Sequence, residues 1–289
     1  MTSLLVEKVR VRLRRLLWHV LTRFAPADRP YTFRLPDGSR FEYPLASAIG
    51  MDLFTNRFEA AEIGFVRTHL APGDVVLDLG ANAGLYTLMA SRLVGERGHV
   101  YAFEPGARAV ALLRRNIELN RLTNVTVINA AVSNETGQAE FGEASDTAMS
   151  SLARIGRDAQ EIQGWNTVRT VRLDDAIAEY GIRTPTFIKM DVEGAEKLAL
   201  DGGPRTLADA PALTILFEAF DENARAFGYT VRDLLDLLEA QGFSLEGFDA
   251  SLTLQPIGDL DARTLGQTVY NFVARKPALQ GNGRGRAAR

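Results

Sequence analysis

The segment Val76–Thr87, VLDLGANAGLYT, constrains the fold of this chain more than any other. The run VVLDL, which includes its first residues, predicts a strand that is buried on both faces. Gly80 and Gly84 follow directly, and the residues after them predict a helix over 85–94. A buried strand that turns at once into a helix is typical of α/β proteins with a parallel sheet. We expect such a turn to leave room for a ligand.

The same alternation continues along the rest of the chain. The apolar runs predict strands at residues 75–79, 99–105, 125–132, 186–192, 212–220 and 268–276, with helices at 85–94, 107–120 and 231–243. Strands that alternate with helices in this way predict an α/β fold. The expected architecture is a Rossmann-like, doubly wound and mostly parallel sheet with helices on both faces.

An extension precedes this predicted sheet. Residues 31–43, YTFRLPDGSRFEY, alternate apolar and polar side chains around Pro-Asp-Gly, which is typical of a β-hairpin, and a helix is expected over 57–70. We therefore divide the chain into an amphipathic helix and hairpin extension at 1–57, a main domain at 58–276 and a basic tail at 277–289. The Gly and Arg content of the tail predicts disorder.

Residues 4–24 have the spacing of a helix with one apolar side. That side consists of Val9, Leu13, Leu16, Leu17, Val20 and Phe24. The interpretation that we favour is a helix packed on the body of the protein, with its basic face in solvent. The alternative is a peripheral contact with an anionic membrane surface or with a partner, which Trp18 near the basic side supports.

Charge and composition limit the classes of partner and compartment. Residues 1–24 carry six basic residues and one acid, and residues 275–289 carry five basic residues and no acid, although the net charge is −3. The segment between them is therefore acidic, so we expect no nucleic-acid partner. The chain has no Cys and shows no signal-peptide pattern or membrane-spanning run, so we expect a cytoplasmic protein, with peripheral membrane contact left open.

Polar residues gather where the predicted strands end, which is the ligand-binding edge of a doubly wound sheet. They are Asp78, Gly80 to Gly84, Glu104, Asn129, Asp191 and Glu218. Gly80 and Gly84 allow a tight turn that a ligand can approach without meeting a Cβ atom. Glu104 ends the second strand, where its carboxylate can accept both hydroxyls of a ribose. The sequence therefore predicts a nucleoside site.

Two nucleoside cofactors are compatible with such a site. A dinucleotide needs a three-glycine turn, but Asn82 stands at the position of the middle glycine. Asp78 would also place a negative charge near the pyrophosphate, whereas it suits the ammonium of an amino-acid portion. S-adenosylmethionine has an amino-acid end, a ribose and no phosphate, so the residues favour this cofactor.

Four blocks carry a resemblance to a known family. They are GDVVLDLGANAGLYT, AFEP, NVTVINAAVSNETG and FIKMDVEGAE. Over about residues 58–275 the chain resembles the FkbM-type methyltransferases of the class I S-adenosylmethionine-dependent fold. The resemblance implies O-methylation of hydroxyls on small molecules, polyketides or sugars. It assigns the cofactor to Asp78, Gly80, Asn82, Gly84 and Glu104, with the adenine near Asn129 to Ala131.

Methyl transfer to an alcohol removes a proton, so a base near the acceptor is expected. His19, His69 and His99 lie away from the ligand-binding edge, and we interpret them as structural or surface groups. In KMDVEG, Lys189 and Asp191 point to the same side of a strand, with Asp191 at the edge of the sheet.

Asp191 is our first candidate for the base or for an acceptor anchor. Glu193 is the second candidate, at the start of the next helix, where a carboxylate suits the helix dipole. The alternative is that Lys189 and Asp191 only form a buried ion pair and that Glu193 and Glu196 only cap the helix. For Glu196 we favour this structural role.

A divalent metal is not assigned. Asp191 and Glu218 fall near the positions of magnesium ligands in catechol-type O-methyltransferases, but Ala219 follows where another oxygen ligand would be needed. The expected partner is a small-molecule or glycan hydroxyl acceptor, bound by residues 1–57, 138–170 and the loop after Glu218.

Three alternatives remain open. An N-methyltransferase, including one that acts on RNA bases, usually carries an Asn/Asp-Pro-Pro-aromatic block where this chain reads MDVEGA. A nicotinamide-dependent oxidoreductase needs the three-glycine turn and a hydride-handling Tyr/Lys or His. A scaffold that binds the cofactor without catalysis is the non-enzymatic alternative.

Overall fold

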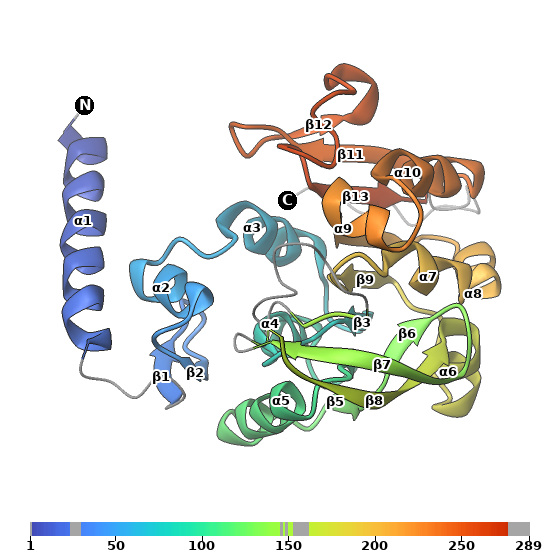
Figure 1. Ribbon diagram of the computed structural model, residues 1–289, viewed down its shortest axis with the longest axis horizontal. Coiled ribbons are helices and arrows are strands. Elements are labelled where there is room, and N and C mark those ends of the chain that lie inside the picture. The colour runs from blue at the N-terminus through green and yellow to red at the C-terminus, as the bar shows by residue number, and fades with distance from the viewer. Residues whose placement is uncertain (1, 24–29, 145–146, 148–149, 153–161, 277–289) are drawn as a thin grey trace.

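The computed structural model describes residues 2–23, 30–144, 147, 150–152 and 162–276. Figure 1 shows a twisted central sheet between two layers of helices, with a hairpin and the N-terminal helix at one side. The helices are α1 (Thr2–Thr22), α2 (Ala48–Thr55), α3 (Ala60–His69), α4 (Leu85–Val94), α5 (Ala107–Leu119), α6 (Leu173–Glu179), α7 (Glu196–Asp201), α8 (Pro204–Asp209), α9 (Asp221–Ala226) and α10 (Val231–Ala240), with the 3-10 turn η3 (Ile257–Asp259).

The strands form three sheets. They are β1 (Pro30–Arg34), β2 (Arg40–Pro44), β3 (Val75–Leu79), β4 (His99–Phe103), β5 (Val125–Ile128), β6 (Ala131–Ser133), β7 (Gly137–Ala144), β8 (Ile162–Arg172), β9 (Phe187–Met190), β10 (Thr214–Glu218), β11 (Ser244–Phe248), β12 (Leu254–Pro256) and β13 (Asn271–Arg275). The main sheet has the order β12-β11-β13-β10-β9-β3-β4-β5, and β6-β8-β7 form a separate three-stranded sheet. The strands from β10 to β5 are parallel, whereas β13 is antiparallel to β10 and to β11.

This arrangement confirms the predicted fold of the class I methyltransferase type, with its N-terminal helix and hairpin. One face of the sheet packs on α3, α4 and α5, and the other packs on α6, α7, α8 and α10. All five residues of β3 are buried, as a strand between two helical layers requires. Because the chain winds in opposite directions from β3 to β4 and from β3 to β9, the ends of these strands leave a crevice between them.

One expectation about the strands is wrong, and one pair of strands was not foreseen. Residues 125–132 form two strands in different sheets, since β5 ends at Ile128 and β6 begins at Ala131. Between them the side chain of Asn129 donates hydrogen bonds to the carbonyls of Glu104 and Pro105, at 2.8 and 3.0 Å, and this holds the break. The long antiparallel pair β7 and β8 was not predicted. The predicted basic tail at 277–289 lies outside the described residues.

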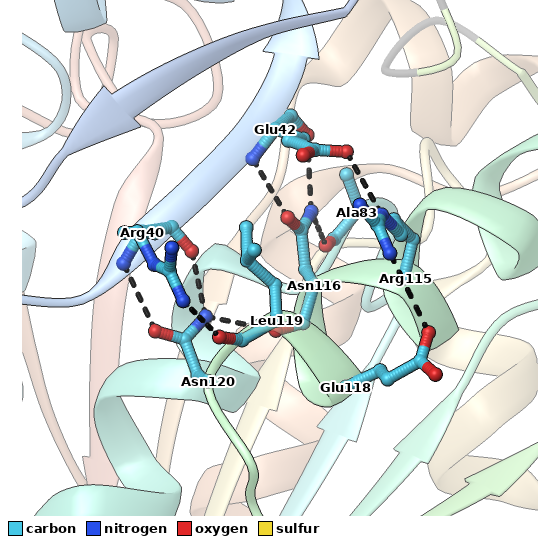
Figure 2. Close-up of polar contacts among 8 residues, drawn as sticks. All are labelled: Arg40, Glu42, Ala83, Arg115, Asn116, Glu118, Leu119 and Asn120. Carbon is cyan, nitrogen blue, oxygen red and sulfur yellow. Dashed lines mark hydrogen bonds and ion pairs between the residues drawn. The ribbon is translucent and has the colours of Figure 1, made fainter.

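The hairpin is attached to the main domain by two asparagine side chains of α5 (Figure 2). Asn116 accepts the N–H of Glu42 at 2.7 Å and donates to its carbonyl at 3.0 Å. Asn120 accepts the N–H of Arg40 at 2.9 Å and donates to the carbonyl of Arg40 at 2.6 Å. Asn116 and Asn120 are four residues apart and share a helix face, and Arg40 and Glu42 are two apart and present their backbone groups on the same strand edge. The two amides therefore bond this edge as a neighbouring strand would. Asn116 also donates to the carbonyl of Ala83, in the turn after β3.

The helix α1 contacts the body differently from our favoured interpretation. The indole N–H of Trp18 donates to the carbonyl of Leu45 at 2.7 Å. The residues of the predicted inner face whose side chains the structure describes, Leu13, Leu16, Leu17 and Val20, are instead 50–63% exposed. The expectation that this face packs on the body is therefore wrong. None of the helices in the described part of the chain has the length and apolar character needed to cross a bilayer.

Candidate active site

The turn between β3 and α4 forms the floor of the site. Gly80, Asn82 and Gly84 all have positive φ angles, of 78°, 48° and 91°. A Cβ atom on Gly80 would lie 1.8 Å from the carbonyl oxygen of Asp191, and one on Gly84 would lie 2.4 Å from Leu113. These glycines are therefore required by the packing of the turn on its neighbours. This agrees with the tight turn expected of the two glycines and adds contacts with neighbouring elements.

Glu104 is held at the end of β4 by two backbone donors. The N–H groups of Asn82 and Gly106 each donate to one carboxylate oxygen at 2.8 Å. The side chain is buried, and burial raises the pKa of Glu104 to about 7, against these two hydrogen bonds, which lower it. The carboxylate is thus fixed in one orientation and keeps lone pairs free for further donors.

Asp78 lies on β3, buried, next to this carboxylate. Its Oδ2 accepts a hydrogen bond from the hydroxyl of Thr87 in the first turn of α4. Burial raises the pKa of Asp78 to about 6, while the Thr87 hydroxyl and Lys189 lower it. A cation placed beside Asp78 would favour its ionised form.

A cavity of about 250 Å³ opens above the turn. It is lined by Asp78, Gly80, Asn82, Gly84, Glu104 and Ala131 among the predicted cofactor residues, and by Lys189, Asp191 and Glu193 among the predicted catalytic ones. Asn129 is not part of the lining, because its amide is used to hold the end of β4. None of the three histidines is among the lining residues that the structure describes.

The charge of the lining decides which kind of cofactor fits. Within the described residues it contains six carboxylates and a single lysine. The carboxylates are Glu59, Asp78, Glu104, Asp191, Glu193 and Glu218. Such a surface repels a pyrophosphate and attracts the sulfonium and ammonium groups of S-adenosylmethionine. The residues present therefore fit this cofactor.

Lys189 and three carboxylates form a cluster in the lining of the cavity. The ammonium of Lys189 lies 3.5 Å from Asp191, and it is 5.0 Å from the centre of the Tyr86 ring. Carboxylate oxygens of Glu59, Asp191 and Glu218 lie within 4.8 Å of one another. Burial disfavours the charged form of Lys189, but the carboxylates, Asp191 first, outweigh it and raise its pKa. The predicted Lys189–Asp191 pair is thus part of a larger network.

Glu59 is the member of this cluster that sequence reasoning missed. It lies at the N-terminus of α3 with φ 35°, and the hydroxyl of Tyr86 donates to its carboxylate. Burial raises the pKa of Glu59 to about 7, and Asp191 and Glu62 add to this, while Lys189 and the Tyr86 hydrogen bond lower it. No motif surrounds Glu59 in the sequence, and only the packing of α3 brings it to the strand ends.

The position of α3 is fixed one turn further along. Glu62 is buried and accepts a hydrogen bond at 2.7 Å from Asn271 at the start of β13. This bond joins the helix to the far side of the main sheet. Glu59 therefore enters the site on a rigid support rather than on a loose loop.

Glu193 lies in a turn, not at the start of a helix as expected. Glu193 and Gly194 have positive φ angles of 52° and 96°, so α7 begins only at Glu196. The carboxylate of Glu193 accepts a hydrogen bond from Asn223 at 3.0 Å. Glu196 is buried outside the cavity lining, where it accepts hydrogen bonds from the N–H of Gly194 and the hydroxyl of Tyr229.

Glu59, Asp191 and Glu218 have the composition of a divalent-cation site. Lys189, however, already places a positive charge beside Asp191. We therefore assign no metal to the cluster.

The remaining wall of the cavity is apolar and aromatic. Phe41, Tyr43, Ile49 and Phe58 come from the hairpin and the residues around α2, and Phe141 comes from β7. All of these except Phe58 belong to two of the three segments expected to build an acceptor pocket. The lining includes Glu218, the last residue of β10. It includes no described residue of the loop that follows β10.

The chain is similar to several known proteins. The chain is 27% identical over 287 residues to the 31-O-demethyl-FK506 methyltransferase FkbM of Streptomyces tacrolimicus, covering 87% of this chain and 99% of that protein. It is 30% identical over 179 residues to the 2-O-methyltransferase NoeI of Sinorhizobium fredii, covering 58% and 72%. A solved SAM-dependent O-methyltransferase from Thermotoga maritima aligns with a TM-score of 0.46 and 15% identity over 90% of this chain and 96% of that one.

The family model described as the methyltransferase FkbM domain matches residues 78–245. That range contains the turn after β3, Glu104 and the strand that carries Lys189. The match sets aside the nicotinamide-dependent oxidoreductase. With its fold and the carboxylate-lined cavity, the chain belongs to the FkbM family of S-adenosylmethionine-dependent methyltransferases.

Proposed function

We propose that this protein methylates a hydroxyl group of a small molecule or a glycan. The observation that carries the proposal is the cluster of Glu59, Asp191 and Glu218 in the lining of the cavity. A hydroxyl must lose its proton as it is methylated, and a carboxylate beside it can accept that proton. The names of two relatives, a 31-O- and a 2-O-methyltransferase, support oxygen as the acceptor atom.

In this proposal the turn after β3 and the end of β4 hold S-adenosylmethionine. Asp78 pairs with its ammonium, Glu104 accepts its ribose hydroxyls, and the adenine lies near Ala131. Gly80, Asn82 and Gly84 shape the turn beneath it, and Asn129 supports Glu104 from outside the cavity. When bound, the cofactor supplies an electrophilic methyl group on a sulfonium.

Glu59 is proposed as the base. A group with a pKa of about 7 is both ionised and basic enough to accept a proton near neutral pH. Asp191, paired with Lys189, is proposed to anchor the acceptor oxygen. Glu193 is bound to Asn223, so we give it a positioning role in the turn before α7.

The aromatic wall favours an acceptor with an apolar or ring face. Phe41 and Tyr43 are buried side chains of the hairpin strand β2, and Phe58 immediately precedes the proposed base. Closing such a wall over the acceptor excludes water and strengthens the interactions of the carboxylate cluster.

The test is incubation with methyl-labelled S-adenosylmethionine and fractions of hydroxyl-bearing metabolites, followed by mass spectrometry of the labelled product. The methyl group is expected on oxygen. Glu59→Gln should lower kcat by about 10²–10⁴-fold, the usual contribution of a general base, with little change in cofactor affinity. Glu62→Gln is the matched control on the same helix, because a glutamine oxygen can still accept from Asn271.

The pH dependence gives a second measurement. Only ionised Glu59 accepts a proton, so kcat/KM for the acceptor should rise with pH through about 7 and then level off. Glu59→Gln should remove this limb. A methyl group found on nitrogen, or an unchanged kcat in Glu59→Gln, would contradict the proposal. A loss of activity in EDTA that Mg²⁺ restores would instead place a cation among the carboxylates.

A further inference from the structure

The helix α1 carries a row of large apolar side chains that the rest of the structure leaves uncovered. Leu13, Leu16, Leu17, Val20 and Leu21 are between 40% and 63% exposed, and we call them the exposed stripe. Their spacing of three and four residues places them on one side of the helix. Only two other large apolar residues in the described chain are as exposed, Tyr31 and Leu252, and they are scattered. An apolar row of this size is typical of an interaction surface.

The exposed stripe faces away from the body. Contact with the body is made by Trp18, through its hydrogen bond to Leu45 and its packing with apolar residues of the hairpin and α2. At 3.6 residues per turn, Trp18 lies on the side of the helix opposite Leu13 and Val20. Figure 1 shows α1 beside α2 at one side of the molecule, away from the helices that cover the sheet.

Arginines border the exposed stripe on both sides. By helical geometry Arg12 and Arg23 adjoin it on one side, Arg14 adjoins it on the other, and Arg10 lies at its N-terminal end. All four are exposed, and none is ion-paired with an acid among the residues that the structure describes. An apolar stripe bordered by basic side chains suits a lipid surface. The apolar side chains can enter the acyl chains, while the basic side chains reach the phosphates at the level of the helix.

We propose that α1 lies in the plane of an anionic lipid surface, with the exposed stripe inserted and the arginines on the lipid phosphates. A second copy of the chain is less suited to cover the exposed stripe. Pairing two stripes would bring the bordering arginines of both helices together, and residues 1–24 carry six basic residues against one acid. The acidic charge of the rest of the chain makes α1 the part that such a surface attracts.

The contact has a consequence for the active site. Trp18 is anchored at Leu45, between Tyr43 and Ile49, which line the cavity. Lipid binding through α1 therefore brings the aromatic wall of the cavity close to the membrane. This placement suits an acceptor that is itself lipid-linked or apolar.

The test is flotation of the full-length protein with vesicles of phosphatidylcholine alone and of phosphatidylcholine mixed with phosphatidylglycerol. Binding to the mixed vesicles should be at least about tenfold stronger and should weaken with added salt. Leu16→Glu should reduce this binding by at least about tenfold, since it puts a charge in the centre of the stripe. Leu252→Glu is the matched control, because Leu252 is 60% exposed but lies far along the chain in a loop.

Cofactor binding and the circular dichroism spectrum should be the same in both variants, which shows that the fold is intact. Equal binding of wild type and Leu16→Glu to the mixed vesicles would overturn the proposal, and so would no binding at all. Dimers in sedimentation analysis that Leu16→Glu dissociates would overturn it in favour of a second copy as the occupant.

Discussion

Replacing Glu104 with glutamine is the sharpest test of the cofactor site. The carboxylate has two oxygens, each of which accepts one backbone N–H at 2.8 Å. Glutamine offers one oxygen and one NH₂ group, so in either orientation an NH₂ faces the N–H of Asn82 or Gly106. The variant also loses one charged acceptor for the ribose hydroxyls. Both the stability of the turn and the affinity for the cofactor should therefore fall.

The magnitudes follow from ordinary hydrogen-bond energies. A buried N–H left without an acceptor costs about 1–3 kcal/mol of stability, and a hydrogen bond to a charged group contributes about 1.5–3 kcal/mol. The second value corresponds to a cofactor affinity about 10- to 150-fold weaker, at 1.4 kcal/mol per factor of ten. Calorimetric titration with S-adenosylhomocysteine measures the affinity, and urea unfolding of the free protein measures the stability.

The pH dependence adds an independent check. Ribose hydroxyls donate to the ionised form of Glu104, whose pKa is about 7 in the free protein. Affinity should therefore weaken as pH falls from 8 to 6 in the wild type, with proton release on binding near neutral pH. Glu104→Gln should show a flatter profile over this range, where Asp78, with a pKa of about 6, contributes less.

Glu196→Gln is the matched control for the affinity. Glu196 is also buried, with a pKa raised by burial to about 7, and it is also held by a backbone N–H, but it lies outside the cavity lining. It should lose stability and keep the affinity of the wild type. An affinity of Glu104→Gln within about threefold of the wild type would refute the placement of the ribose, since even one lost charged hydrogen bond exceeds that change.

Three further outcomes are expected. Gly80→Ala should lower the free energy of unfolding in urea by more than about 3 kcal/mol, because the added Cβ would lie 1.8 Å from the Asp191 carbonyl oxygen. In the control Gly73→Ala the added Cβ meets no atom, so the loss should be about 1 kcal/mol. Asn116→Ala should cost about 2–3 kcal/mol, since it leaves buried backbone groups of the hairpin unpaired. Removal of residues 1–24 should leave the affinity for S-adenosylhomocysteine unchanged; a large loss would show that α1 supports the cavity.

The fold was predictable where the physical cause is local. Apolar runs and helical periodicity identified β3, α4, β4, α5, β9, β10, α10 and β13, because each buries its own side chains between layers. The β7–β8 pair and the break between β5 and β6 were not predictable in this way. They depend on pairing between distant segments and on the Asn129 amide, which periodicity does not report.

The residues of the candidate site also fall into a group that local sequence predicts and a group that depends on tertiary packing. Asp78, Glu104 and Asp191 were placed from the sequence because the ends of parallel strands meet at one edge of a sheet. Glu59 was missed because it precedes the first strand of the main sheet and reaches the site only through the packing of α3. The close contacts of Gly80 with Asp191 and of Gly84 with Leu113 were also beyond sequence reasoning, since these neighbours come from other elements.

By itself the sequence determined the alternation of the main parallel strands with helices, the β3 turn with its carboxylates, and the amphipathic character of α1. These depend on side chains within a few residues of one another. Only the tertiary structure decided that Glu59 joins Lys189 and Asp191, and that α1 turns Trp18 inward and the exposed stripe outward. Both outcomes depend on which surfaces of separate elements come into contact, and a local pattern specifies that a face is apolar but not what covers it.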